Sequence, residues 1–142
     1  MVEHAETDEA ILACREVLRE LRPHLAEGEF LATVREMQKD GLRLACIREG
    51  GRVVAVAGYR ISTSLFCGKH LYVDDLVTAE TERSKGHGKA LLGWLREQAV
   101  ANDCDVFHLD SGVQRKRAHA FYQREGMELA SYHFSVRLKP RS

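Results

Sequence analysis

Apolar residues in the first forty positions recur at intervals of three and four, which is the spacing of one face of a helix. The segment 8–22 is therefore predicted to be a helix, with Thr7 or Asp8 able to cap its start. Pro23 then breaks or bends the chain, because proline cannot continue the helical hydrogen bonds. A second helix is predicted over 29–40 from a similar apolar stripe.

After these helices the apolar residues follow the two-residue period of a strand. Residues 42–47 alternate in this way, and the Gly-Gly pair at 50–51 is typical of a two-residue hairpin turn. The partner strand is predicted over 52–61, followed by a loop over 62–68 and a third strand over 69–78.

The third strand contains a shift in its pattern. Leu71 and Val73 share one face, but the next apolar residue is Leu76. A change of parity near Asp74 and Asp75 is what a β-bulge produces. A strand buried on both faces, with the two acids facing its edges, explains the pattern equally well.

The second half of the chain alternates helices and strands. A helix is predicted to follow residue 88, then a strand over 104–109, a helix over 115–125 and a last strand within 127–138. Hairpin strands come first and strand–helix–strand crossovers second, which implies an α/β (α+β) chain with a mixed, mostly antiparallel sheet and helices on both faces. No linker or repeat interrupts the sequence, so residues 1–142 are expected to form a single domain.

Composition excludes several classes of protein. Lys+Arg and Asp+Glu both number 21, and a net charge of +0 does not fit a general nucleic-acid binder or a polybasic membrane binder. No apolar run approaches the ~20 residues of a membrane-spanning helix, and the N-terminus has no signal-peptide core. The charge is nevertheless divided, since residues 1–40 carry a net −5 and residues 41–142 a net +5.

Cysteine and histidine patterns predict no metal site. The four cysteines are too far apart in sequence for a zinc motif, and the seven histidines show no paired metal spacing. Scattered cysteines in a chain of this length are typical of small buried hydrophobic residues. We therefore expect no metal and a reducing, cytoplasmic location. The cysteines are Cys14, Cys46, Cys67 and Cys104.

Eight consecutive residues between a predicted strand and a predicted helix carry the strongest chemical signal. Two glycines allow the backbone to approach a ligand closely, and the helix N-terminus directs free N–H groups to the same place. Three cations and no acid lie in this segment, which predicts an anion site, most simply for phosphate. A Walker loop is excluded because Arg83 occupies the position of its first glycine, and a dinucleotide fingerprint is weak because Leu91 replaces its third glycine. The segment is Arg83, Ser84, Lys85, Gly86, His87, Gly88, Lys89 and Ala90.

What remains is the pattern (Arg/Gln)-x-x-Gly-x-Gly/Ala between a strand and a helix. It resembles motif A of the GNAT superfamily of acetyl-CoA-dependent N-acetyltransferases. Residues 71–77 look like the family's central strand, and 118–127 look like its motif B helix and the following turn. The predicted elements fit the family's order, (β)ααβββαβαβ, although about six residues before the first helix leave the first strand almost absent. Ser84 stands where many members have glycine.

The resemblance implies a reaction and roles for particular residues. An acetyl group would move from acetyl-CoA to an amine by direct attack in a ternary complex, without a metal and without a covalent acyl-enzyme. Asp74 or Asp75 would accept the amine's proton, with Asp74 favoured slightly, and Tyr122 would protonate the departing thiolate. Backbone N–H groups would bind the pantetheine arm and the phosphates of the cofactor. The residues implied are Leu76, Val77 and Thr78 for the arm and the segment 83–90 for the phosphates.

Two other interpretations stay open. The chain could be a non-catalytic coenzyme A-binding or partner-binding module, although the two carboxylates and Tyr122 argue against this. A nucleic-acid binder using the basic segments 83–89 and 115–117 is disfavoured, because no aromatic residues are interleaved with them. The resemblance implies a small-molecule or protein amine as acceptor and is compatible with a homodimer. The acidic character of residues 1–40 favours a cationic amine.

Overall fold

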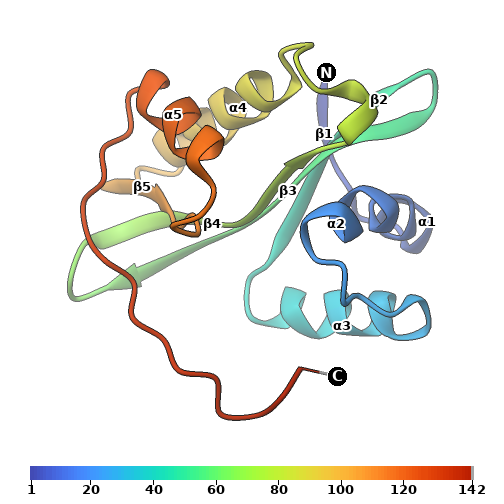
Figure 1. The fold of residues 1–142 in the computed structure, drawn as a ribbon, viewed down its shortest axis with the longest axis horizontal. Coiled ribbons are helices and arrows are strands. Elements are labelled where there is room, and N and C mark those ends of the chain that lie inside the picture. Colours follow the sequence, from blue (N-terminus) through green and yellow to red (C-terminus); the bar gives the residue numbers. More distant parts are fainter. Residues whose placement is uncertain (142) are drawn as a thin grey trace. The chain divides into compact units, whose positions relative to one another are not determined.

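Five strands form one sheet, in the order β1-β2-β3-β4-β5, in the computed structural model, which describes residues 1–141 (Figure 1). The first four strands are antiparallel to their neighbours, and the sheet as a whole is mixed, so the predicted α/β fold class is confirmed. The strands are β1 (Val2–His4), β2 (Arg43–Glu49), β3 (Arg52–Ser64), β4 (Gly68–Thr78) and β5 (Val106–Leu109). The helices are α1 (Asp8–Ala13), α2 (Arg15–Leu21), α3 (Glu27–Lys39), the short 3₁₀ helix η1 (Glu80–Glu82), α4 (His87–Ala101) and α5 (Lys116–Arg124).

The first helix predicted from the sequence is divided in two at Cys14. The Cys14 N–H donates to the Ile11 carbonyl at 3.0 Å, a bond over three residues that tightens the turn and separates α1 from α2. Thr7 caps α1 as predicted, because its Oγ1 accepts from the Ala10 N–H at 3.1 Å. The second of these helices ends two residues before Pro23, in agreement with the predicted break.

The first strand, which the sequence leaves almost absent, is present. Val2 lies opposite Ile47 and His4 opposite Ala45, so β1 is an antiparallel edge strand on β2. The His4 imidazole also exchanges a hydrogen bond with the buried Tyr59 hydroxyl at 2.8 Å. Three residues are therefore sufficient for this strand, because both its backbone and one side chain are tied to the sheet.

The two hairpins differ in how well the sequence predicts them. Gly50 and Gly51 have φ of 60° and 79°, which is the primed turn expected of a Gly-Gly pair between strands. The β3–β4 hairpin is longer than predicted, since pairing continues to Ser64 opposite Gly68. The predicted loop over 62–68 is therefore wrong and shrinks to a three-residue turn. The hairpin ends of β3 and β4 consist largely of polar residues, so no alternation of apolar residues predicts a strand there.

The predicted irregularity in the third strand is a β-bulge. Gly58 of β3 lies opposite Asp75 and the next residue, Tyr59, lies opposite Val73. Asp74 is therefore the extra residue of β4, which turns two successive acids toward the same face of the sheet. The alternative of a regular strand with edge-facing acids is excluded by this register.

Helices cover both faces of the sheet within residues 1–108, which form one compact unit (Figure 1). On one face α1, α2 and α3 pack against β2 and β3 in a single apolar core. On the other face α4 packs through Trp94, whose ring meets the ring of Tyr59 edge-on at 5.9 Å between centroids. The core of the first face includes Ile11, Val17, Leu18, Phe30, Val34, Leu44, Cys46 and Val56.

Residues from 109 onward form a second unit that contains α5. The prediction of a last strand within 127–138 is wrong for the described residues, where this segment has no strand. Its apolar side chains do alternate, but they are exposed, and a strand without a paired neighbour is not stable in water. The alternating residues are Tyr132, Phe134, Val136 and Leu138.

Candidate functional site

The segment between η1 and α4 has the backbone of an anion site. Gly86 precedes α4 with φ of 85°, in the left-handed region, and among residues 1–141 no side chain caps the N–H groups that follow it. Ser84 also has a positive φ, 70°, which explains physically why a glycine is suited to this position. Exposed residues surround the turn, so the free N–H groups of the first turn of α4 are accessible to a phosphate.

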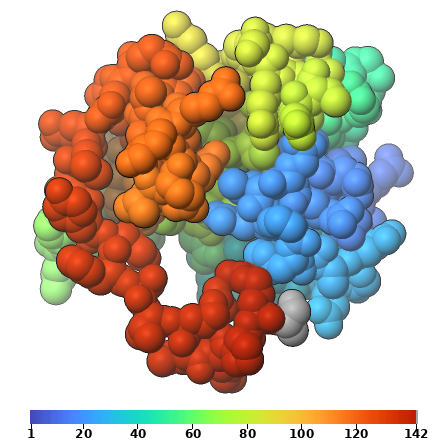
Figure 2. All heavy atoms as spheres, in the orientation of Figure 1, coloured from blue at the N-terminus to red at the C-terminus, as the bar shows by residue number. Residues whose placement is uncertain are grey.

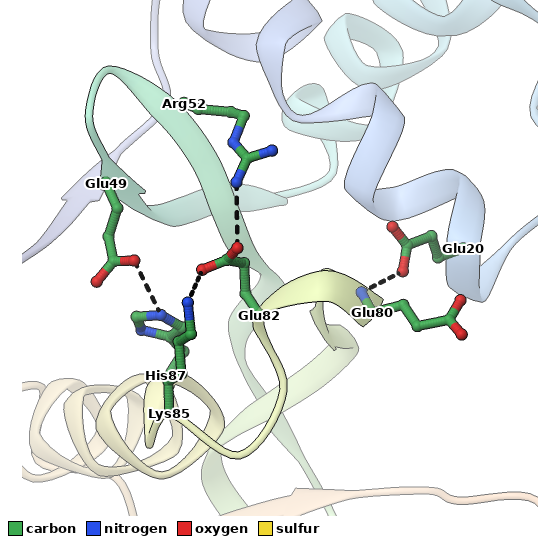
Figure 3. Close-up of polar contacts among 7 residues, drawn as sticks. All are labelled: Glu20, Glu49, Arg52, Glu80, Glu82, Lys85 and His87. Carbon is green, nitrogen blue, oxygen red and sulfur yellow. Dashed lines mark hydrogen bonds and ion pairs between the residues drawn. The ribbon is translucent and has the colours of Figure 1, made fainter.

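Lys85 differs from the other two cations of this segment because its ammonium is paired with an acid (Figure 3). Lys85 Nζ lies 2.9 Å from Glu82 Oε1, and Arg52 donates to the other oxygen of the same carboxylate at 3.1 Å. The segment itself contains three cations and no acid, but Glu82 is adjacent to it and neutralises Lys85. Within residues 1–141 no carboxylate forms an ion pair with Arg83 or Lys89, which are both exposed.

Glu82 is the residue that organises this cluster, and sequence reasoning missed it. Its side chain is 10% exposed, and the hydrogen bond from Lys85 holds the pKa of the Glu82 carboxyl below its usual value. The same bond raises the pKa of Lys85. Beside this pair, His87 Nε2 lies 3.5 Å from Glu49 Oε1 at the end of β2. The three-residue separation of Glu82 and Lys85 is the one signal that the sequence offers.

A second acid fixes the start of η1. Glu20 of α2 accepts a hydrogen bond from the Glu80 N–H at 2.7 Å, so a carboxylate binds an otherwise free backbone donor (Figure 3). Figure 2 shows the yellow-green segment around residue 80 at the surface beside the blue N-terminal helices. The segment between η1 and α4 is thus held from two sides. The β2–β3 hairpin contacts it through Glu82, and α2 contacts it through Glu20.

The two acids of the bulge lie beside two arginines. Asp75 Oδ1 is 2.7 Å from Arg22 Nε, and Asp74 Oδ2 is 3.0 Å from Arg60 Nε. Arg22 also donates to the Asp74 carbonyl at 3.2 Å. Both carboxylates are mostly covered, with 18% of the Asp74 side chain and 20% of the Asp75 side chain exposed. The structure therefore brings the two predicted acids together and supplies partners from α2 and β3.

The environment of Asp74 favours the protonated form of its carboxyl. Burial raises the pKa of the Asp74 carboxyl above its ordinary value of 3.8, and the nearby Arg60 guanidinium opposes this without reversing it. A carboxylate that is desolvated in this way holds a proton more strongly than an exposed one, so it is a better proton acceptor at neutral pH. The residue with this raised pKa, Asp74, is also the extra residue of the bulge.

Beyond the bulge, Leu76 to Thr78 pair with Ala57 to Ala55 of β3. On the other edge of β4, the Asp105 N–H donates to the Lys69 carbonyl at 2.6 Å, and the His108 ring meets Tyr72 at 5.1 Å. Residue numbers rise together from the first contact to the second along both strands, so β5 runs parallel to β4. It pairs with the part of β4 that precedes the bulge. β5 ends one residue after His108.

Tyr122 lies on α5 in the second unit and is partly buried. Burial raises the pKa of its phenol, and the Arg115 guanidinium opposes the change. Its ring lies 5.4 Å from that of Phe121. A phenol kept neutral in this way is able to donate a proton.

Comparison with known proteins identifies the family. The model of the acetyltransferase (GNAT) family matches residues 7–127. The chain belongs to the GNAT family of acetyltransferases. This GNAT chain is 35% identical over 120 residues to a Bacillus subtilis protein described as an uncharacterized N-acetyltransferase, YhdJ, covering 83% of this chain and 84% of the relative. These relationships support N-acetyltransferase activity.

Solved structures show the same fold at lower identity. A Bacillus halodurans protein described as a transcriptional regulator superposes with a TM-score of 0.87 at 18% identity, covering 97% of this chain and 99% of that one. AAC(6')-Iy, solved with a bisubstrate analogue of coenzyme A and acetylneamine, superposes with a TM-score of 0.83 at 16% identity, covering 99% of this GNAT chain and 98% of the other.

None of the helices within residues 1–141 of the GNAT chain has the length and apolar character needed to cross a membrane.

Proposed function

We propose that this GNAT protein transfers an acetyl group from acetyl-CoA to an amine by direct attack in a ternary complex. The observation that carries the proposal is the bulge that places Asp74 on a covered face of the sheet with a raised pKa. Support for the donor comes from the family, and from the structural neighbour that was solved with a coenzyme A analogue.

The donor would be held mainly by backbone groups. The N–H groups at the start of α4 would bind the pyrophosphate, with Arg83 and Lys89 as the exposed cations that complete the site. N–H groups of Leu76 to Thr78 on the edge away from β3 would bind the pantetheine arm, and one near the bulge would polarise the thioester carbonyl. The loop residues proposed for the phosphates remain Arg83, Ser84, Lys85, Gly86, His87, Gly88, Lys89 and Ala90.

Removal of a proton from the amine makes a large contribution to the free-energy barrier of this reaction. An alkylammonium with a pKa near ~10.4 leaves about one molecule in ~10³ as free base at pH 7, which corresponds to about 4–5 kcal/mol of barrier. Asp74 is proposed as the acceptor of this proton, directly or through water. Asp75 is proposed as a positioning residue, because its carboxylate holds Arg22, which in turn binds the Asp74 carbonyl.

Tyr122 is proposed to protonate the coenzyme A thiolate as it leaves. The ordinary pKa of a phenol, about 10, is near that of a thiol at about 8.5, so the two groups can share a proton in the transition state. Burial raises the pKa of the Tyr122 phenol above that value, which keeps it in the neutral form that donates the proton. The transfer passes directly from thioester to amine, so no step requires a cysteine nucleophile. The phenol therefore affects turnover but contributes little to binding of the cofactor.

Three broader proposals accompany this one. Residues 1–142 would act as one N-acetyltransferase domain, since the family model spans both units. Four free cysteines are consistent with a cytoplasmic location.

The acceptor would be a cationic small-molecule or protein amine, because the helices that cover the Asp74 face belong to the acidic part of the chain. A homodimer stays a prediction that the mass in solution would test.

The test is release of free thiol from acetyl-CoA across a panel of cationic, neutral and anionic amines. Turnover with at least one cationic amine is expected. Tyr122→Phe should lower kcat by about 10²-fold and leave the affinity for coenzyme A unchanged. The alternative, a non-catalytic coenzyme A-binding module, predicts coenzyme A binding with no thiol release for any amine. Preference for anionic acceptors would contradict the proposed role of the acidic helices.

A further inference from the structure

Three metal-binding side chains meet at the end of the β3–β4 hairpin, away from the phosphate loop. Cys67 lies in the turn of the hairpin, His70 lies on β4 and His108 lies on β5. One ligand atom from each lies within 4.8 Å of the others. The prediction of no metal rested on cysteines that are far apart in sequence and on histidines without paired metal spacing. The third residue comes from a strand 38 positions further along the chain.

The hydrogen bonds around the cluster orient its ligand atoms. His70 Nδ1 and His108 Nε2 lie 2.9 Å apart, and His70 Nε2 lies 3.3 Å from Ser62 Oγ. If Nε2 of His70 donates to Ser62, its Nδ1 has a lone pair free for a metal, which is how a second residue fixes the tautomer of a histidine ligand. Ser64 Oγ lies 3.2 Å from Cys67 Sγ and restrains the thiol in the same way.

Small side-chain movements would bring these ligand atoms to the separations of a tetrahedral zinc site. With zinc–nitrogen bonds of about 2.0–2.1 Å and a zinc–sulfur bond of about 2.3 Å, ligand atoms lie about 3.3–3.6 Å apart. The two histidine nitrogens would separate by about half an ångström and lose the proton that they share. All three side chains are partly exposed, so an ion has access to them without unfolding the hairpin.

We propose that Cys67, His70 and His108 bind one Zn²⁺, with a fourth position open to water or another ligand. One thiolate and two imidazoles select a borderline-soft cation over Mg²⁺ or Ca²⁺, which prefer oxygen ligands. A second group with the same proximity, Glu49, Glu82 and His87, is less suited to a metal because Arg52 and Lys85 occupy the Glu82 carboxylate.

The zinc site would be separate from the proposed base. His70 and Asp74 lie on the same face of β4, since His70 is opposite Ser62 and Asp74 binds Arg60, which is two residues before Ser62 on β3. Four residues along a strand place them about 13 Å apart. Zinc would therefore not take part in proton removal but would join the β3–β4 turn to β5. This inference stands or fails independently of the acetyl-transfer proposal.

The test is metal binding by the full chain after removal of metal with a chelator. Zn²⁺ should bind with a stoichiometry of one in competition with a coloured chelator, and Co²⁺ should give the intense absorption of a cobalt–thiolate bond. Cys67→Ala should abolish that absorption and weaken Zn²⁺ binding by about 100-fold or more. Cys104→Ala is the matched control, because this cysteine is also partly exposed but outside the cluster, and it should bind as the unmodified chain does.

A second variant guards against misfolding. His108→Gln should weaken Zn²⁺ binding while its circular dichroism spectrum and cooperative melting stay those of the unmodified chain. Added Zn²⁺ should raise the melting temperature of the unmodified chain and of Cys104→Ala, but not of Cys67→Ala. Absence of the cobalt–thiolate absorption, or equal Zn²⁺ affinity in Cys67→Ala, would overturn the proposal and leave an adventitious ion only.

Discussion

The loop before α4 and the bulge in β4 prepare two different kinds of chemistry. The loop offers backbone N–H groups and exposed cations, and its shape depends on residues that are adjacent in sequence, such as Ser84 and Gly86. The bulge offers carboxylates, and each is paired with an arginine that is distant in sequence. Arg22 lies 53 positions from Asp75, and Arg60 lies 14 positions from Asp74.

In this fold the proposed binding loop depends on residues that are close in sequence, whereas the proposed proton acceptor depends on residues that are far apart in sequence. An anion site at a helix start needs a local backbone conformation and tolerates exposure. A proton acceptor needs a desolvated environment, which only packing between distant elements provides. Substitutions in the loop should therefore change affinity for the cofactor, whereas substitutions at the bulge should change the rate of the chemical step.

The largest effect is expected at Asp74. Asp74→Asn keeps the shape of the side chain but removes its basicity, so kcat should fall by about 10²-fold or more while the KM for acetyl-CoA stays nearly constant. Steady-state kinetics with a cationic amine would measure both. Asp75→Asn is the matched control and should lose less than about tenfold, since Asp75 acts through Arg22. Equal losses in the two variants would remove the distinction between acceptor and positioning residue.

A smaller effect, of the opposite kind, is expected in the loop. Arg83→Ala should raise the KM for acetyl-CoA by about tenfold, because one charge-assisted contact to phosphate is lost, and should leave kcat unchanged. Lys39→Ala removes another exposed cation, which lies on α3, and should have no effect. A fall in kcat for Arg83→Ala at saturating acetyl-CoA would show that the loop also contributes to chemistry.

The smallest effect is expected at the acid that supports the loop. Glu82→Gln should lower the melting temperature slightly at pH 7, because the carboxylate joins Arg52 and Lys85. A lowered pKa means that this stabilisation is fully present above the ordinary value of 4.5 and is lost as pH falls through the lowered one. Thermal melts from pH 7 down to acid should therefore show the two proteins converging.

Glu36→Gln is the control for this comparison. Glu36 pairs with Lys39, and both side chains are 73% exposed, whereas the Glu82 side chain is 10% exposed. A fully solvated pair contributes almost nothing to stability, so Glu36→Gln should melt with the unmodified protein at every pH. If Glu82→Gln behaves in the same way, Glu82 is not what holds the loop to the hairpin.

Much of the fold was predictable from the sequence for the same reason that the loop was. Helix periodicity, the Thr7 cap, the Gly-Gly turn and the parity shift at Asp74 are all local patterns, and the structure confirms them. The long β3–β4 hairpin was missed because polar residues form its far half. The last strand was wrongly predicted because residues 127–138 alternate but have no strand partner among the described residues.

The candidate site was predictable only in part. Asp74, Asp75 and the segment 83–90 could be selected from residue types and spacing, yet nothing local indicated that burial would raise the pKa of Asp74. Glu82 escaped notice because its burial depends on the β2–β3 hairpin. The proximity of His108 to His70 likewise depends on β5 lying beside β4. Local sequence patterns do not predict such contacts between elements that are far apart in the chain.

Asp74 as the proton acceptor is tested most directly by the pH dependence of kcat/KM for the unmodified protein and for Asp74→Asn. Because Asp74 must be unprotonated to accept a proton, kcat/KM of the unmodified protein should fall on acidification through a pKa above the ordinary 3.8. Asp74→Asn should be slow at every pH and should lack this acid limb. An unchanged limb in Asp74→Asn, at an undiminished rate, would contradict the assignment of Asp74 as the base.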